Sequence, residues 1–226
     1  MKNIFLVIFI SFFTGISINA QSLLPNKYGI KVGVNIANVN SATIEGVKNI
    51  DNSSKIGISG GFYSEFPLND RWYINPEILY SQKGTSFNYD FTHDYDINSR
   101  QDYNTKNDLS FTYIELNPIV SFKANHKFAL NIGPSAAYLI ANEYTYTPSP
   151  AHLYNDLPDG EIDDESLDIG LNCGLSYYFS DNFLINARVT TGFMKITDVI
   201  RPIDEDNNPA FSLKNRKISF FLAYLF

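Results

Sequence analysis

Apolar and polar residues alternate along eight separate stretches of this chain, and this two-residue period restricts its fold more than any other feature. Successive side chains of a β-strand point to opposite sides, so the pattern predicts strands with one apolar and one polar face. The predicted strands cover residues 28–36, 55–66, 72–83, 113–122, 128–140, 167–179, 185–192 and 217–226.

The connections between these stretches alternate between short and long. The short ones are 67–70, 123–126 and 180–182, and the long ones are 37–54, 84–108, 142–166 and 194–212. Short turns at one end and long loops at the other are typical of bacterial outer-membrane barrels. The sequence therefore predicts an all-β fold, an eight-stranded antiparallel up-and-down transmembrane β-barrel with both termini in the periplasm.

A soluble lipocalin-like barrel is the alternative, because it shows the same alternation with the apolar face turned inward. Two further features favour the membrane. The apolar faces carry aromatic residues near the strand ends, as expected of interfacial girdles, and Trp72, Phe128 and Tyr224 are examples. The polar faces are rich in Gly, Ser and Asn, which fit a narrow lumen.

The first twenty residues have the layout of a secretory signal peptide. Lys2 is followed by an apolar run from Ile4 to Phe13 and then by small and polar residues ending at Ala20. An apolar run of this length is too short for a membrane-spanning helix, which needs about 20 residues. We therefore expect a signal peptide over 1–20 and a single barrel domain over 21–226.

The composition excludes several classes of function. Cys173 is the single cysteine of the chain, so no disulfide within it is possible. A net charge of −7 argues against a nucleic-acid partner, which requires a basic face. No phosphate-binding glycine loop or metal-ligand spacing is present, so no cofactor is expected.

Charged residues interrupt the polar faces near the middle of the strands. Four are basic and four are acidic: Lys31, Lys83, Arg188, Lys217, Glu65, Glu77, Glu115 and Asp168. An eight-stranded barrel has an interior just wide enough for its side chains, so these charges should pair across it. We expect Arg188 to bridge Glu77 or Glu115 and the network to close the lumen; charges lining a wet pore are the alternative.

Acidic residues are concentrated in the third long loop, 142–166, which contains seven of them and no Lys or Arg. Carboxylates suit a hard cation such as Ca²⁺, although the EF-hand spacing fails here. A weak cation site is one hypothesis, and a solvated, repelling loop is the simpler one. The residues concerned are Asp156, Asp159, Glu161, Asp163, Asp164 and Glu165.

Catalysis is possible at the loop rim, where His93 lies among Asp90, Asp94 and Asp96 and where His152 occupies another loop. A general base needs a defined orienting partner, and a loop rich in Asp, Asn and Tyr supplies such neighbours by chance. The third histidine, His126, falls in a short turn. We therefore expect no catalytic residue and no enzyme, with a rim enzyme acting on lipid or peptide as the alternative.

Two segments resemble a known family. Pro76–Gly84 (PEILYSQKG) and Tyr113–Pro118 (YIELNP) are similar to the third and fourth strands of PorT-like outer-membrane β-barrel proteins of the Bacteroidota. Ala20-Gln21, Arg188 and the terminal Phe226 extend the resemblance over the mature chain. It implies an outer-membrane barrel in a family named after a member tied to protein secretion. Asn117 before the proline and the longer acidic loops depart from the family pattern.

The final strand also predicts how the chain is inserted. Phe226, Tyr224 and Leu222 share its apolar face, and the resemblance implies that such an end is presented to the barrel-assembly machinery. The expected partners are this machinery, outer-membrane lipid and an extracellular ligand or protein. The expected function is structural or binding, through the long loops; a narrow passive channel is a further alternative.

Overall fold

The computed structural model describes residues 25–41, 48–94, 100–149, 166–195, 197–200 and 209–226. Nine strands lie within these residues. They are β1 (Lys27–Ser41), β2 (Lys48–Pro67), β3 (Trp72–Asp94), β4 (Arg100–Lys123), β5 (Phe128–Ser149), β6 (Leu167–Tyr178), β7 (Phe183–Gly192), β8 (Thr197–Ile200) and β9 (Pro209–Leu225). No helix among the described residues is both long enough and apolar enough to cross a membrane. The predicted signal peptide, 1–20, lies outside the described residues.

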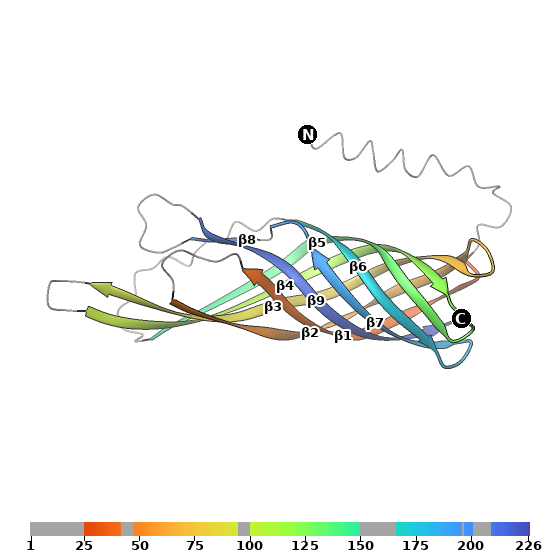
Figure 1. Cartoon of the computed structure of the whole chain (residues 1–226), viewed down its shortest axis with the longest axis horizontal. Coiled ribbons are helices and arrows are strands. Elements are labelled where there is room, and N and C mark those ends of the chain that lie inside the picture. The colour runs from red at the N-terminus through yellow and green to blue at the C-terminus, as the bar shows by residue number, and fades with distance from the viewer. Residues whose placement is uncertain (1–24, 42–47, 95–99, 150–165, 196, 201–208) are drawn as a thin grey trace, which may run out of the picture.

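Eight of the strands form a closed antiparallel barrel (Figure 1). Each of the strands from β1 to β6 pairs with the next, β7 pairs directly with β9, and β9 pairs with β1 to close the ring. The predicted eight-stranded up-and-down barrel is thereby confirmed. The short β8 was not predicted; it pairs with β9 alone and lies outside the ring.

The barrel has two unlike ends (Figure 1). The short connections β2–β3, β4–β5 and β6–β7 and the C-terminus lie at one end, which we call the short-turn end. At the other, the long-hairpin end, β3 and β4 continue as a ribbon beyond the rest of the ring. Their pairing runs without interruption from Trp72 and Phe122 to Asp94 and Arg100.

The predicted boundaries of the long loops were therefore wrong. Most of 84–108 belongs to β3 and β4, and much of 37–54 belongs to β1 and β2. β5 continues to Ser149, and part of 194–212 belongs to β8 and β9. The physical reason is that backbone pairing needs no apolar face: outside the lipid both faces of a strand can be polar, and the two-residue period that revealed the strands disappears.

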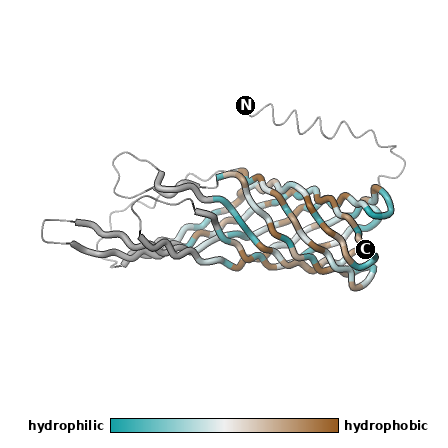
Figure 2. Tube along the Cα trace, in the orientation of Figure 1, coloured by the Kyte–Doolittle hydropathy of each residue, from teal (hydrophilic) through white to brown (hydrophobic). Residues whose placement is uncertain are grey.

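Apolar side chains cover the outside of the barrel and polar side chains fill its inside. Ile56 and Phe62 of β2 are 76% and 71% exposed, whereas Ser59, Tyr63 and Glu65 of the same strand are buried. Figure 2 shows the resulting alternation of hydrophobic and hydrophilic residues along the strands. An apolar exterior around a polar interior is the arrangement of a barrel that faces lipid, so the predicted assignment of the two faces is confirmed.

The pairing of β4 with β5 is interrupted at one position, where ladder hydrogen bonds cannot form. Hydrogen-bonded and non-hydrogen-bonded pairs alternate along two antiparallel strands. The amide of Ala124 donates to the carbonyl of Phe128, and counting every second pair from there in the same register brings Pro118 of β4 opposite Pro134 of β5 at a hydrogen-bonded position. Proline has no N–H, so neither residue can donate there. The assigned pairs on either side are Leu116–Ala136 and Val120–Ile132. The side-chain amide of Asn172 reaches from β6 to the carbonyl of Pro134, at 3.3 Å.

Candidate functional site

All eight charged residues predicted for the lumen lie inside the barrel, and each is at most 4% exposed. They are Lys31, Glu65, Glu77, Lys83, Glu115, Asp168, Arg188 and Lys217. Alternation places them there: every second side chain of a strand points inward, and each of these residues is in phase with the small polar residues of its strand. Burying so many charges requires partners, and the interior supplies them in three clusters.

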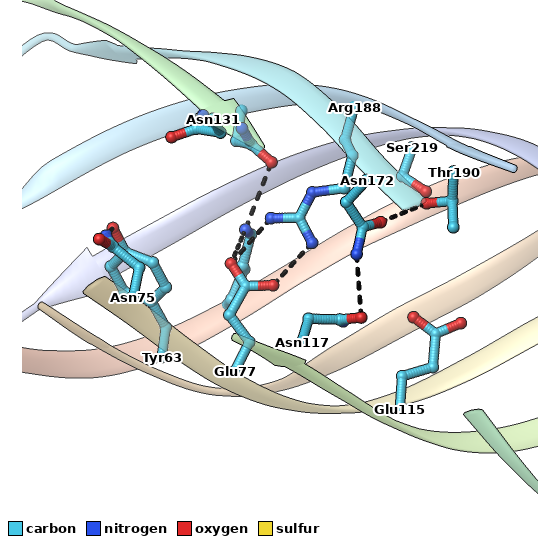
Figure 3. Close-up of polar contacts among 12 residues, drawn as sticks. Tyr63, Asn75, Glu77, Glu115, Asn117, Asn131, Asn172, Arg188, Thr190 and Ser219 are labelled. Atoms are coloured by element: carbon cyan, nitrogen blue, oxygen red, sulfur yellow. Dashed lines mark hydrogen bonds and ion pairs between the residues drawn. The ribbon is translucent and has the colours of Figure 1, made fainter. Parts of the chain in front are cut away.

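The first cluster is built around Glu77 of β3 (Figure 3). Arg188 of β7 reaches across the lumen and donates from both terminal nitrogens to the two carboxylate oxygens, at 2.7 and 2.8 Å. Lys31 of β1 donates to the same carboxylate at 2.7 Å and to Asn186 at 3.3 Å. The Lys31 ammonium also lies 4.5 Å from the ring centre of Phe221, so an aromatic face balances the second positive charge.

The second cluster lies nearer the long-hairpin end. Glu115 of β4 accepts from Lys217 of β9 at 2.6 Å and forms an ion pair with Lys83 of β3 at 3.2 Å. Lys83 also donates to Asp168 of β6 at 3.2 Å, and Asn215 donates to the same Asp168 oxygen at 2.8 Å. Two cations and two carboxylates therefore neutralise each other across four strands.

Amide and hydroxyl side chains occupy the space beside these two clusters. The Asn172 amide nitrogen donates to the Asn117 oxygen at 3.1 Å, and the Thr190 hydroxyl donates to the Asn172 oxygen at 2.7 Å (Figure 3). Lys217 donates to Ser81 at 3.0 Å. These contacts bind side chains of several strands together, so the interior is a hydrogen-bonded network rather than isolated ion pairs.

A third cluster at the short-turn end includes a residue that sequence reasoning misplaced. Glu65 forms an ion pair with Lys123 at 3.2 Å and accepts from the hydroxyls of Tyr63, at 2.7 Å, and Tyr178, at 2.5 Å. Lys123 was predicted to belong to a turn, but it is the last residue of β4, and its ammonium lies 3.9 Å from the ring centre of Tyr73. With Lys123 the three clusters together hold five cations and four carboxylates.

Buried apolar side chains lie beyond the charged clusters, towards both ends of the interior. At the short-turn end a buried group joins Tyr63, Ala129, Tyr178, Leu184, Ala223 and Leu225. Towards the long-hairpin end, Leu109, Phe111 and Tyr113 of β4 are at most 2% exposed, and the rings of the last two are 6.3 Å apart. The register sets Phe111 beside Lys83 and Leu109 beside Thr85, so these side chains lie inside the barrel, between the second cluster and the long-hairpin end.

This arrangement suits charge neutralisation rather than proton transfer. Glu77 and Glu115 each contact two cations, which stabilise the ionised carboxylate and make it a poor general acid. No group of three His, Cys, Asp or Glu side chains able to hold a metal ion occurs among the described residues. His93 was predicted to lie in a loop but belongs to β3, where its backbone faces Gln101. His126 lies in an exposed turn, as predicted, and His152 lies outside the described residues.

Two further predictions concern the cation site and the C-terminal strand, and only the second falls on residues that the structure describes. The hypothetical cation site, Asp156 to Glu165, lies outside the described residues. Phe226 and Leu222 are on the exposed outer face of the barrel, and Tyr224 contacts the ring of Phe226 edge-on at 4.9 Å. Phe183 adds a further ring contact to Tyr224 at 4.8 Å, so the chain end belongs to an aromatic belt at the short-turn end.

Sequence reasoning missed the buried apolar residues at both ends of the interior. It looked for polar residues among the inward-facing positions, and apolar residues also occupy some of these positions. Leu184 and Leu225 are in phase with the lumen residues Arg188 and Phe221 of their strands, and this phase is the signal that identifies them. Leu109 and Phe111 lie between the predicted loop 84–108 and the strand predicted from residue 113, so neither was assigned to a strand.

Several solved structures are similar to this chain. Among solved structures, Neisserial surface protein A (NspA) is 12% identical, with 88% of this chain and 97% of that chain covered and a TM-score of 0.49. OprG from Pseudomonas aeruginosa is 13% identical, with 88% and 95% covered and a TM-score of 0.43. The outer membrane protease OmpT from Escherichia coli is 9% identical, with 92% and 99% covered and a TM-score of 0.44. No curated protein matched the sequence.

The family comparison is decisive. A sequence model described as the outer membrane protein beta-barrel domain matches residues 19–198, which is most of the chain. Proteins of this family are located in the bacterial outer membrane, as the apolar outer face of the barrel requires. The chain belongs to the outer membrane protein beta-barrel domain family.

Proposed function

We propose that this protein is a closed, non-conducting barrel that anchors long β-hairpins in the outer membrane for binding at the cell surface. The observation that carries the proposal is the paired charge network around Glu77 and Glu115, bounded by apolar side chains towards both ends. An ion crossing this interior would have to displace several buried ion pairs and then pass an apolar constriction.

The lengths of the strands support a role at the long-hairpin end. A transmembrane β-strand needs about 9–11 residues, whereas β3 has 23 and β4 has 24. More than half of each strand is therefore available beyond the lipid. Long connections face the exterior in barrels of this kind, so we place the long-hairpin end outside and the short turns with the C-terminus in the periplasm.

The proposed partner is an extracellular ligand or protein that contacts the hairpins. Residues 142–166, which follow in sequence from the long-hairpin part of β5, contain seven acidic residues and no Lys or Arg, and this charge favours a basic or cation-bridged partner. We further propose that the protein is one of the PorT-like barrels of the Bacteroidota; the resemblance of Pro76–Gly84 and Tyr113–Pro118 to such proteins supports this. We propose no catalytic residue, because each buried carboxylate is already bound to a cation.

Planar-bilayer recording tests the closed lumen. The refolded full-length mature protein should show no stable unitary conductance in symmetric salt over a range of voltages. A reproducible large conductance in the unmodified protein contradicts the proposal, because it requires a continuous wet path past Arg188 and Leu184.

Trimming the β3–β4 hairpin tests the binding role. Residues 86–108 are replaced by a two-residue Asn-Gly turn that joins the paired residues Thr85 and Leu109. A pull-down from native outer membrane should lose its specific partner, while the trimmed barrel still folds and inserts. His93→Ala in the intact hairpin is the matched control and should retain the partner. If His93→Ala abolishes a measurable hydrolytic activity, the protein is an enzyme and the proposal fails.

A further inference from the structure

Arg216 is a cation on the outer face of the barrel, and no partner for it occurs among the described residues. Arg216 of β9 is exposed, in phase with the lipid-facing Ile218, whereas its neighbour Lys217 points inward. The guanidinium of Arg216 makes no hydrogen bond or ion pair with any residue that the structure describes. The cations of the three interior clusters differ, because each of them contacts a carboxylate. Lys214, one position further along the same outer face, is exposed as well.

Arg216 lies at the boundary between the apolar and the polar part of the outer face. The register sets it between Asn38 of β1 and Thr191 of β7, so a row of three polar residues crosses three neighbouring strands. One row closer to the short-turn end, the outward-facing residues of the same three strands are all apolar. They are Ile36, Ile218 and Val189, each about two-fifths exposed. Lipid headgroups must begin where such an apolar belt ends.

We propose that Arg216 and Lys214 bind the phosphate group of a lipid headgroup in the leaflet at the long-hairpin end. The planar guanidinium presents a fork of N–H donors that matches phosphate oxygens, and the lysine adds a second charge. β1, β7 and β9 contain no Asp or Glu along their whole length, so none of these strands supplies a competing carboxylate. The nearest acidic residue by register is Asp198 of β8, beside Ser212.

A lipid fits this site better than a free phosphate ion. Two exposed cations on a convex wall bind a small anion weakly, because water screens the attraction. A lipid adds acyl chains that lie along the apolar row below Arg216, and the membrane holds its phosphate at the level of that side chain. In the orientation proposed above this leaflet is the outer one, but the binding itself does not depend on the closed lumen or on the orientation.

Native mass spectrometry of the refolded full-length mature protein tests the proposal. The detergent-solubilised barrel is titrated with phosphatidic acid and, separately, with diacylglycerol carrying the same acyl chains. Arg216→Gln should weaken phosphatidic acid binding about fivefold, and Arg216→Gln with Lys214→Gln at least about tenfold. Binding of diacylglycerol should not change, because it lacks the phosphate. Heat-modifiable migration on a gel verifies that each variant has folded.

Arg71→Gln and Lys127→Gln are the matched controls, because both cations are exposed at the short-turn end. They should retain the parental affinity. The proposal is overturned if the double variant binds phosphatidic acid as tightly as the parent, or if the controls weaken it equally. Competition by inorganic phosphate at the lipid concentration would indicate a free-anion site and overturn it too. Asp198→Asn should leave the affinity unchanged; a marked tightening would show that Asp198 already neutralises the cations.

Discussion

Arg188 on β7 holds both carboxylate oxygens of Glu77 on β3, from the opposite wall of the barrel. Lys31 shares that carboxylate, so the three side chains are not equivalent. Removing the single anion leaves two buried cations without a carboxylate partner, whereas removing one cation leaves the anion paired with the other. The barrel should therefore tolerate the loss of the arginine better than the loss of the glutamate.

The first prediction measures this asymmetry. Arg188→Met should lower the free energy of unfolding by about 3 kcal/mol, and Glu77→Gln by about 5 kcal/mol, within the range for breaking a buried ion pair. Urea unfolding in lipid vesicles provides the measurement. Arg71→Met, at an exposed turn, should stay within about 0.5 kcal/mol of the parent. Equal losses for Arg188→Met and Glu77→Gln would show that Lys31 does not share the charge.

The second prediction concerns the cluster at the short-turn end. Lys123→Met leaves Glu65 with two tyrosine hydroxyls and no cation, so it should cost about 1–3 kcal/mol, less than the loss of Glu77. The Lys123 side chain is 22% exposed, which further reduces the expected loss. The same unfolding assay applies, with Lys127→Met as the exposed control. A loss as large as that of Glu77→Gln would contradict the role given to the tyrosines.

The third prediction compares two adjacent glycines. A Cβ on the inward Gly61 would lie 2.0 Å from the carbonyl oxygen of Ile78, whereas one on the outward Gly60 would lie 3.2 Å from that of Lys31. Gly61→Ala should therefore destabilise the barrel by at least about 3 kcal/mol or prevent folding. Gly60→Ala should change stability by less than about 1 kcal/mol. Folding yield in vesicles, read from gel migration, gives the comparison; similar yields would refute it.

The fourth prediction tests the interrupted pairing of β4 with β5. Pro134→Ala supplies an N–H that can donate to the carbonyl of Pro118 and restores one ladder hydrogen bond. Backbone amides of β4 near this position should then exchange hydrogen more slowly than in the parent. Hydrogen-exchange mass spectrometry measures the change, and β1–β9, on another side of the barrel, serves as the internal reference. Unchanged exchange in β4 would mean that this pairing is not weakened by its prolines.

The fifth prediction separates the contributions of the charged residues and of the apolar side chains to the proposed closure of the lumen. Neutralising Glu115 alone should not produce conductance, because Leu184 and Leu225 still close the short-turn end. Combining Glu115→Gln with Leu184→Ala and Leu225→Ala should produce small, variable currents in a planar bilayer. The variant with only the two alanine substitutions is the control and should remain closed. Conductance in Glu115→Gln alone would assign the closure to the charges.

The sequence predicted the barrel well because every residue of a spanning strand must face either the lipid or the lumen, which fixes whether it is apolar or polar. Ile218, Phe220 and Leu222 must face lipid, so Lys217 and Ser219 must face the lumen, and the period is unmistakable. Beyond the lipid this constraint ends. For that reason the sequence predicts a loop from Gly84 onward, although the pairing of β3 with β4 continues to Asp94.

The charged interior was predictable residue by residue, but its pairing was not. Alternation identifies Glu77, Glu115 and Arg188 as inward-facing, whereas the strand tilt decides which of them meet across the barrel. Lys123 was missed because a lysine beside a turn normally extends into water. Its position is understandable only when Glu65 and Tyr73, both distant in sequence, are placed around it in the fold.

The continuous β3–β4 ribbon has a consequence for encounters with the surroundings. The ten residues from Thr85 to Asp94 span about 33 Å at the usual rise of a strand. In the proposed orientation, with the long-hairpin end facing the medium, an antibody, a phage or a soluble protease should meet this ribbon before the other strands that the structure describes. Surface variation and immune recognition should therefore concentrate on the hairpin, while the wall of the barrel remains out of reach.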